Sequence, residues 1–308
     1  MRSNLALHAN FILNPFLPVA GNYQGLFYDT NGVVHQSSGF FSAKVTPKGT
    51  FTSKWQSGAN RYSLSGQFTA GGTFSNSILR KGLSPLSVRL QLDMASAEIL
   101  NGTITDGTWT STLIANRGVY SLTNPAPQAG KYTLALPGSE DSAVQPGGDS
   151  VSTLTVSALG AAGFAGTLGD GSRITQKTII SRDGQSPFYV SLYAGQGSIL
   201  GWITIVDQLT NDISGLVNWI KPAQPLAKLY RNGFTNQIEA IGSAYHFSNP
   251  VRVLNLSTGI VAPARGNLAA GFTNVVALGT DNKVINLSSN KLTLTLITPS
   301  GLFRGTAT

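Results

Sequence analysis

The chain has 308 residues, of which only 11% are charged, and its 21 Lys and Arg against 13 Asp and Glu give a formal net charge of +8. It contains no Cys, which excludes disulfides, thiolate nucleophiles and cysteine-ligated zinc. The length suits two or three domains. With so few charges the surface must be covered by neutral polar side chains, which is typical of β-rich exoproteins.

Residues 5–20 are moderately apolar, but Asn10, Asn14, Pro15 and Pro18 interrupt them. The segment is therefore a poor signal peptide. Nowhere does the chain hold a run of 18 apolar residues, so the sequence predicts no membrane-spanning helix. We expect residues 1–20 to form an extended arm or an edge strand.

A repeat begins directly after this arm. The segment 21–27, around Tyr23, recurs as 130–136, around Tyr132, and both copies continue with a polar loop and a strand–turn–strand unit. A third copy is expected to start near 242–245. Its turn Thr298–Gly301 repeats the turn Thr46–Gly49 almost letter for letter, but only a few residues follow it. We therefore predict two full repeats and one partial repeat.

Apolar and polar residues alternate in 62–68, 154–156 and 293–297, which predicts half-buried antiparallel strands. Asn-Gly and Asp-Gly pairs between such segments favour tight hairpin turns. The predicted fold class is all-β, with tandem antiparallel β-meander barrels or sandwiches. The predicted units are an arm (1–20), repeat 1 (21–125), repeat 2 (126–232) and a partial repeat 3 (233–308). The segment 88–93 is matched to 189–193, and 102–104 to 201–203.

The partial third repeat has an unpaired sheet edge in this scheme, and such edges are usually covered. We expect either the arm 1–20, a second copy of the chain, or a further part of a larger parent chain to complete it.

Oxygen-rich loops offer one kind of chemistry. Glu140, Asp141 and Asp149 lie close together in a Gly-rich loop, at the place in repeat 2 that Asp29 holds in repeat 1. Turn formation explains most Asp and Asn residues in such loops. Carboxylates gathered in this way are also ligands for Ca²⁺, so this loop is the candidate metal site.

Catalytic candidates are sparse. His8, His35 and His246 share no metal-ligand spacing, and the sequence holds no nucleophile elbow, phosphate loop or dinucleotide fingerprint. His246 is a candidate general base. Asp207 and Asp212 are candidate bases for a reaction in which Ca²⁺ polarises a carbonyl.

Aromatic residues offer a third kind of site. Tyr189, Tyr193 and Trp202 alternate along one predicted sheet and could line one face. Packing in the core is the common role of such residues. An exposed face of aromatic rings would instead bind a glycan or another small molecule.

The net charge of +8 suits a polyanion partner. The basic residues are scattered, however, with no run longer than two. Nucleic acid is therefore disfavoured as a partner.

Four segments carry a resemblance to known sequences: 21–27, 63–68, 106–109 and 189–193. They resemble uncharacterised β-rich repeat regions of very large bacterial exoproteins. The resemblance implies an extracellular or cell-surface location and a chain that is a fragment of a longer product. It implies no catalytic residues.

Three functions remain open at this point. The first is an extracellular or cell-surface module that binds or adheres to a glycan or a surface. The second is a Ca²⁺-dependent hydrolase of a small neutral ester or lactone, such as a lactonase. The third, weaker one is polyanion binding.

Overall fold

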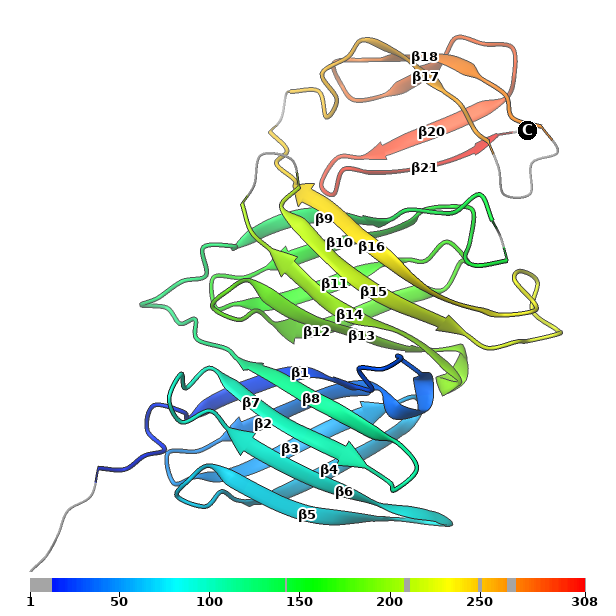
Figure 1. Ribbon diagram of the computed structural model, residues 1–308. Coiled ribbons are helices and arrows are strands. Elements are labelled where there is room, and N and C mark those ends of the chain that lie inside the picture. Colours follow the sequence, from blue (N-terminus) through cyan, green and yellow to red (C-terminus); the bar gives the residue numbers. More distant parts are fainter. Residues whose placement is uncertain (1–12, 142, 208–210, 249–250, 265–269, 308) are drawn as a thin grey trace, which may run out of the picture.

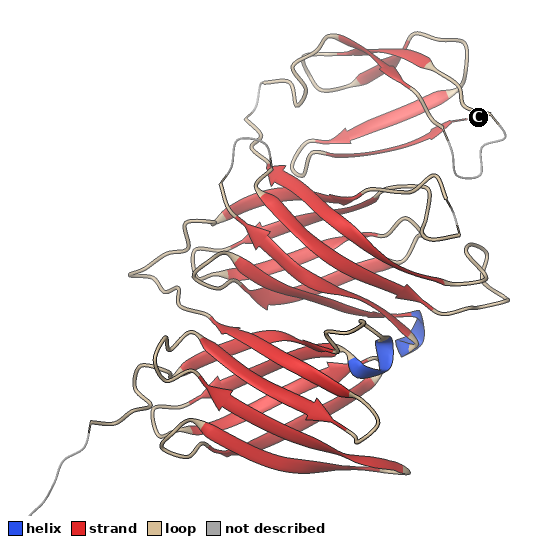
Figure 2. Cartoon of the chain, viewed as in Figure 1, coloured by secondary structure: helices blue, strands red, loops and turns tan. Residues whose placement is uncertain are grey.

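The computed structural model describes residues 13–141, 143–207, 211–248, 251–264 and 270–307. In this part the chain is all-β, as predicted, and two short 3-10 helices, η1 (His35–Ser37) and η2 (Tyr193–Gly195), interrupt the strands (Figure 2). No helix among these residues has the length and apolar character needed to cross a membrane.

The first sheet, called barrel 1, has eight antiparallel strands in the order β4-β3-β2-β1-β8-β7-β6-β5 (Figure 1). The central strands β1 and β8 pair with each other, and a meander runs outward from each of them. The sheet curls until its edge strands β4 and β5 approach, so the barrel is nearly closed. The strands are β1 (Gly21–Tyr28), β2 (Gly39–Val45), β3 (Thr50–Ser57), β4 (Asn60–Gln67), β5 (Thr73–Arg80), β6 (Leu83–Leu92), β7 (Ile99–Thr105) and β8 (Thr110–Arg117).

The second sheet, called barrel 2, repeats this topology in the order β12-β11-β10-β9-β16-β15-β14-β13. Each strand of barrel 1 thus has a counterpart eight strands later, and the predicted tandem of two full repeats is confirmed. The strands are β9 (Gly130–Leu136), β10 (Ser150–Val156), β11 (Ala161–Thr167), β12 (Arg173–Ile179), β13 (Gln185–Leu192), β14 (Gly197–Ile205), β15 (Ile213–Lys221) and β16 (Phe234–Ala244).

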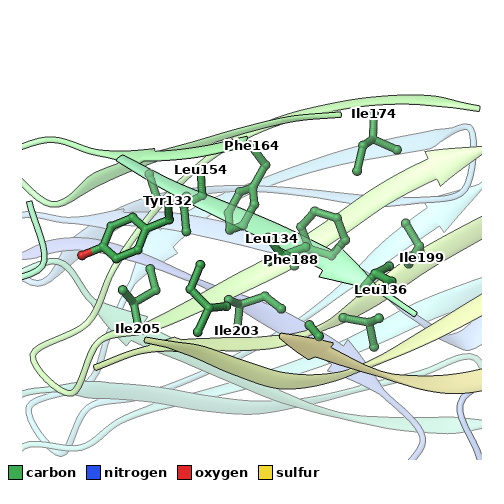
Figure 3. Close-up of a cluster of buried hydrophobic side chains, with 14 of the residues drawn as sticks. Tyr132, Leu134, Leu136, Leu154, Phe164, Ile174, Phe188, Ile199, Ile203 and Ile205 are labelled. Atoms are coloured by element: carbon green, nitrogen blue, oxygen red, sulfur yellow. The ribbon is translucent and has the colours of Figure 1, made fainter. Parts of the chain in front are cut away.

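Strand alternation builds the two cores, because every second side chain of a strand points into its barrel. The interior of barrel 1 is rich in aromatic rings, such as Phe41, Phe51 and Phe68. Barrel 2 is filled mainly by aliphatic side chains around Phe164 and Phe188 (Figure 3). Each barrel therefore has its own core.

A turn at the same place in each unit confirms the repeat in atomic detail. In barrel 1, Gly49 ends the β2–β3 turn with a φ of 74°, and a Cβ there would lie 2.6 Å from the Phe16 ring. In barrel 2, Gly160 has a φ of 73°, and a Cβ there would lie 2.7 Å from Tyr120. Glycine is needed because the backbone is left-handed and an aromatic ring from the preceding segment covers it.

The third unit follows the same rule. Its hairpin consists of β20 (Leu292–Ile297) and β21 (Leu302–Ala307), as predicted, and Tyr245 covers its turn glycine, Gly301. Three further short strands form a separate sheet in the order β17-β18-β19: β17 (Thr258–Val261), β18 (Asn274–Leu278) and β19 (Val284–Asn286).

Two predicted details were wrong. The segment 234–244 is β16, which pairs with β9 and completes barrel 2, so barrel 2 extends past the expected boundary at 232 and the third copy does not begin at 242. The expected matches were also shifted by one strand, since β6 corresponds to β14 and β7 to β15. Every strand has a similar alternation of apolar and polar residues, and the loops 137–149 and 222–233 are longer than their counterparts in barrel 1. Strands of the two repeats can therefore be matched one strand out of step.

The arm belongs to barrel 1 in its described part. Residues 1–12 lie outside the described residues. Phe16 and Val19 are buried in the core of barrel 1, and the Val19 carbonyl accepts a hydrogen bond of 2.7 Å from the Tyr23 hydroxyl. The third unit lies at the other end of the molecule (Figure 1). Residues 13–20 therefore do not complete the third unit of the same chain.

Candidate ligand groove between the barrels

Barrels 1 and 2 are joined by an apolar contact. Leu26 on β1 and Leu200 on β14 are each about 1% exposed, and Tyr189 on β13, which is 5% exposed, packs with them in one cluster. Trp202 and Phe40 pack around this cluster and are partly buried. Burial of this kind holds the barrels in one fixed arrangement.

Polar contacts at the same junction fix the arrangement further. The Gly58 amide donates a hydrogen bond of 2.7 Å to the Tyr189 hydroxyl. A Cβ on Gly58 would lie 2.6 Å from the Gly195 carbonyl oxygen, so glycine allows the two backbones to approach this closely. His35 lies 2.9 Å from the same carbonyl and 3.0 Å from the Ser198 hydroxyl. The Gly195 carbonyl accepts from Nε2, so Nδ1 accepts from Ser198.

Tyr189 is buried enough at this junction to change its acidity. Burial raises its pKa to about 12, and the hydrogen bond from Gly58 acts in the opposite direction. The tyrosine therefore stays neutral across the physiological range. Its ring forms part of the wall of a groove between the barrels.

This groove, called the inter-barrel groove, consists of two adjoining cavities of about 460 and 360 Å³. Both barrels line the larger one, and barrel 1 alone lines the smaller one. The two cavities share Phe40, Gln56 and Arg61, which are cross-strand neighbours on β2, β3 and β4. The groove therefore runs continuously from the outer face of barrel 1 to the junction.

Strand β12 supplies the opposite wall. Arg173, Thr175 and Lys177 alternate along it and point outward, while Ile174 between them is buried in the core of barrel 2. Residues two apart on a strand are about 7 Å apart. The two cations of β12 thus stand about 13 Å apart along the groove.

The charge of the groove is entirely positive. Arg61, Arg173 and Lys177 line the larger cavity and Lys54 lines the smaller one, whereas neither lining includes Asp or Glu. None of these four side chains forms an ion pair with a carboxylate among the described residues. Neutral hydrogen-bonding groups, such as Gln56 and Ser191, stand between them. The positive charge and the neutral hydrogen-bonding groups of this lining are chemically suited to an anionic ligand.

The predicted aromatic face does not form. Tyr189 is buried at the junction, and Trp202 is partly buried against the same cluster. Tyr193 lies in η2, where its hydroxyl donates to Asp170 at 2.6 Å and accepts from the Trp219 indole at 2.9 Å. Burial, followed by the hydrogen bond to Asp170, raises the pKa of Tyr193 strongly. Of the three, Tyr189 lines the inter-barrel groove.

The expected calcium ligands are not brought together. Asp149 accepts a hydrogen bond of 2.8 Å from the Gly138 amide, and Asp141 accepts one of 2.9 Å from the Ala143 amide. Both are loop-forming contacts, and Glu140 lies beside Asp141. Among the described residues no group of three or more His, Asp or Glu side chains is placed to hold a metal ion.

The expected catalytic residues lie at the end of barrel 2 that faces the third unit. The Asp212 carboxylate accepts a hydrogen bond of 2.5 Å from the Ala244 amide, which ties β15 to β16. Asp207 is exposed in the β14–β15 loop, and His246 is exposed after β16. They line none of the cavities described here.

Sequence reasoning missed the groove because its cations come from two different repeats. The alternation of Arg173, Thr175 and Lys177 is visible in the sequence and places two cations on one face of a strand. Their neighbour Arg61 lies in the other repeat, and only the docking of the barrels brings it close.

No protein-family model matches the chain, and no curated protein matches it by sequence. Among solved structures, it is similar to a protein of unknown function from the DUF3598 family of Nostoc punctiforme, with 12% identity, a TM-score of 0.26, and coverage of 75% of this chain and 98% of that one. At this TM-score the likeness bears on neither fold nor function.

Proposed function

We propose that the chain is an extracellular or cell-surface binding module, and that an acidic polysaccharide is the ligand of its inter-barrel groove. The observation that carries this proposal is the gathering of Arg61, Arg173 and Lys177 in one cavity with no carboxylate in its lining. The groove joins two of the functions that the sequence left open, glycan binding and polyanion binding.

The neutral part of the lining favours a sugar polymer over a nucleic acid. Gln56, Thr175 and Ser191 offer amide and hydroxyl groups that match sugar hydroxyls. Single-stranded nucleic acids need exposed aromatic rings on which bases stack, but Tyr189 in this groove is buried. Phe40 and Val190 are half-buried and supply apolar surface in the same cavity.

The groove is open and its cations are spread along it, which suits an extended ligand. The Cα atoms of Arg173 and Lys177 alone are about 13 Å apart, so their side chains can contact successive charges of one extended ligand. A polymer with a carboxylate or sulfate on successive sugars reaches all of the cations together.

The test is binding of defined polymers by calorimetry: alginate as a polyuronate, neutral dextran of matched length, and a DNA duplex. We expect alginate to bind and dextran not to bind. Replacing Arg61, Arg173 and Lys177 with Ala should weaken alginate binding at least about 30-fold. The slope of the logarithm of the binding constant against the logarithm of the salt concentration should become shallower by about two to three.

The matched control carries the same change of charge away from the groove. Lys48, Lys81 and Lys228 are exposed and line none of the described cavities. Their triple Ala variant should bind alginate within about twofold of the wild type, since distant exposed charges are screened. Equal loss in both triple variants would show that net charge, and not the groove, binds the polymer. Tighter binding of DNA than of alginate would overturn the choice of ligand.

A further inference from the structure

The three-stranded sheet of the third unit has apolar residues on both of its faces. On β18, Val276 and Leu278 point to one face and are buried, whereas Val275 points to the other face and is exposed. The hairpin β20–β21 lies between this sheet and barrel 2 (Figure 1), and an antiparallel bridge from Lys283 to Thr295 joins the two. The buried face is the one that the hairpin covers, so the exposed face points away from the barrels.

The strand register gathers large aliphatic side chains on this exposed face. Ile260 pairs with Val275, and the Leu287 amide donates a hydrogen bond of 2.8 Å to the Val275 carbonyl from the other side. In the next row, Ala277 pairs with Ile285. The four large residues among these are between 45 and 71% exposed. Together the five residues form one apolar surface, called the β18 face: Ile260, Val275, Ala277, Ile285 and Leu287.

A comparable outer row of barrel 1 is polar. Across β5, β6 and β7 it consists of Ser75, Arg89 and Thr103, all of which are exposed. Scattered apolar residues are ordinary on a protein surface, but a contiguous exposed group of them marks an interaction site. The β18 face is such a group, and the outer face of β5–β7 is not.

The charges beside the β18 face favour an apolar protein surface over a lipid surface. The face itself carries no charge. Lys283 is the charged residue nearest to it in sequence, and its ammonium forms an ion pair of 3.0 Å with Asp281. Attraction to an anionic membrane needs unpaired basic residues beside the apolar ones. An uncharged apolar partner therefore fits this face better.

The β18 face is complementary to a second copy of itself. Two sheets commonly bury their apolar faces by packing against each other about 10 Å apart. About a two-fold axis that runs along β18, Ile260 of one copy lies over Leu287 of the other, and the two Val275 side chains meet. Ile285 then lies over Thr258, whose methyl group is also apolar. The large residues of the face thus meet apolar groups of the second copy.

We infer that a second copy of the chain covers the β18 face, so that two molecules associate through their third units. The face is about 10 Å wide across its three strands and its two rows are about 7 Å apart. A stable complex buries about 800 Å² per partner, which is more than this face supplies, so the dimer is weak and forms at high protein concentration. The inter-barrel groove lies on the other side of barrel 2 (Figure 1), and both grooves of the dimer stay open.

Sedimentation velocity of the whole chain between about 5 and 200 µM tests the inference, since an interface of this size has an expected Kd of about 10–100 µM. We expect the wild type to pass from monomer to dimer across this range. Val275→Glu should weaken dimerisation at least about 30-fold, because two like charges would meet at the axis. Val151→Glu is the matched control. Val151 is 39% exposed on β10 of barrel 2, against 45% for Val275, and this variant should dimerise like the wild type.

Each other outcome has a fixed meaning. A wild type that stays monomeric at the highest concentration would overturn the inference, and so would an equally tight dimer in Val275→Glu. Binding of the wild type to phosphatidylglycerol vesicles that Val275→Glu abolishes would assign the face to a lipid surface instead.

Hydrogen exchange of the wild type decides if Val275→Glu fails to fold. The amides of β17, β18 and β19 should exchange more slowly at the highest concentration than at the lowest, and those of β5–β7 should not change. Exchange in β17–β19 that is independent of concentration would overturn the inference.

Discussion

The two barrels share one topology but differ at the seam where their edge strands meet. In barrel 2 the Gln176 side chain joins β12 to β13, accepting from the Tyr189 amide at 2.9 Å and donating to the Pro187 carbonyl at 3.2 Å. The corresponding position in barrel 1 is Leu64 on β4. The correspondence follows when residues are counted from the turn glycines Gly49 and Gly160 along β3 and β11 and then across the paired strands to β4 and β12. The seam of barrel 1 therefore closes by apolar packing around Phe74 and not by hydrogen bonds.

The mouths of the barrels also differ in hydrogen bonding, and barrel 2 again has the hydrogen bonds. At the mouth of barrel 2, the Tyr193 hydroxyl forms hydrogen bonds with both the Asp170 carboxylate and the Trp219 indole. The buried Lys221 ammonium lies 4.2 Å from the centre of the Tyr193 ring. At the mouth of barrel 1 the Trp55 indole has no such partner. The two mouths thus differ in whether their buried indole N–H is hydrogen-bonded to the described protein atoms.

The largest expected effect tests the polar mouth of barrel 2. Tyr193→Phe removes the hydroxyl that serves Asp170 and Trp219, and one of the two lost hydrogen bonds involves a charged group. We expect the free energy of unfolding to fall by about 3 kcal/mol, measured by urea denaturation. Tyr62→Phe, at the mouth of barrel 1, should cost less than about 1 kcal/mol because it removes no hydrogen bond to the described protein atoms. Equal losses would remove the distinction between the mouths.

The pH dependence tests the junction between the barrels. Tyr189 has a folded pKa of about 12, above the unfolded value of about 10. A raised pKa means that the folded chain holds the proton more tightly, so this stability is complete below pH 10 and is lost as the pH rises toward 12. We expect Tyr189 to account for about 2 kcal/mol of the loss between pH 9 and 11.5.

Denaturation at both pH values checks this expectation. Tyr23, whose pKa burial also raises to about 12, adds its own share to the loss in the wild type. Tyr189→Phe should therefore lose less stability than the wild type over this interval while retaining the part due to Tyr23. An unchanged loss in Tyr189→Phe would contradict the account of the junction.

The seam of barrel 2 gives a smaller effect. Gln176→Leu copies the residue that barrel 1 has at this position and removes both seam hydrogen bonds. We expect a loss of about 1.5 kcal/mol. Native-state hydrogen exchange should show faster exchange at the Tyr189 amide, which loses its acceptor. If that amide exchanged as slowly as in the wild type, Gln176 would not be holding the seam.

The reverse exchange in barrel 1 should have the smallest effect. Leu64→Gln adds a polar group where the seam is apolar, at a half-buried position. We expect the free energy of unfolding to fall by about 1 kcal/mol, because the half-buried Leu64 side chain packs against the core of barrel 1. A rise of about 1 kcal/mol or more in the free energy of unfolding would mean that a glutamine can join the edge strands of barrel 1 as well. The two seams would then differ only in this residue.

Local sequence patterns were enough for the all-β class, the repeat and its turns. Thr46–Gly49 and Thr298–Gly301 form the same hairpin turn because glycine, not alanine, fits the left-handed position under an aromatic ring. Strand partners could not be assigned as safely. Every strand has the same alternation, so a shift by one strand, as for 88–93, leaves the pattern unchanged.

The candidate site depended on contacts that no local pattern encodes. Glu140, Asp141 and Asp149 are close in sequence, but the Asp141 and Asp149 carboxylates accept from loop amides, and the described residues hold no group of three such side chains placed for a metal. Arg61 and Arg173 are far apart in sequence and line one cavity, because Leu26, Tyr189 and Leu200 dock the barrels. A buried junction between repeats is a tertiary property, and the groove follows from it.

Hydrogen exchange measured by mass spectrometry with and without alginate tests the groove most directly. Slower exchange is expected in β4 and β12, the strands that carry Arg61, Arg173 and Lys177, and the hairpin β20–β21 should be unaffected. Slowing confined to the third unit or to β5–β7, with β4 and β12 unchanged, would contradict the account.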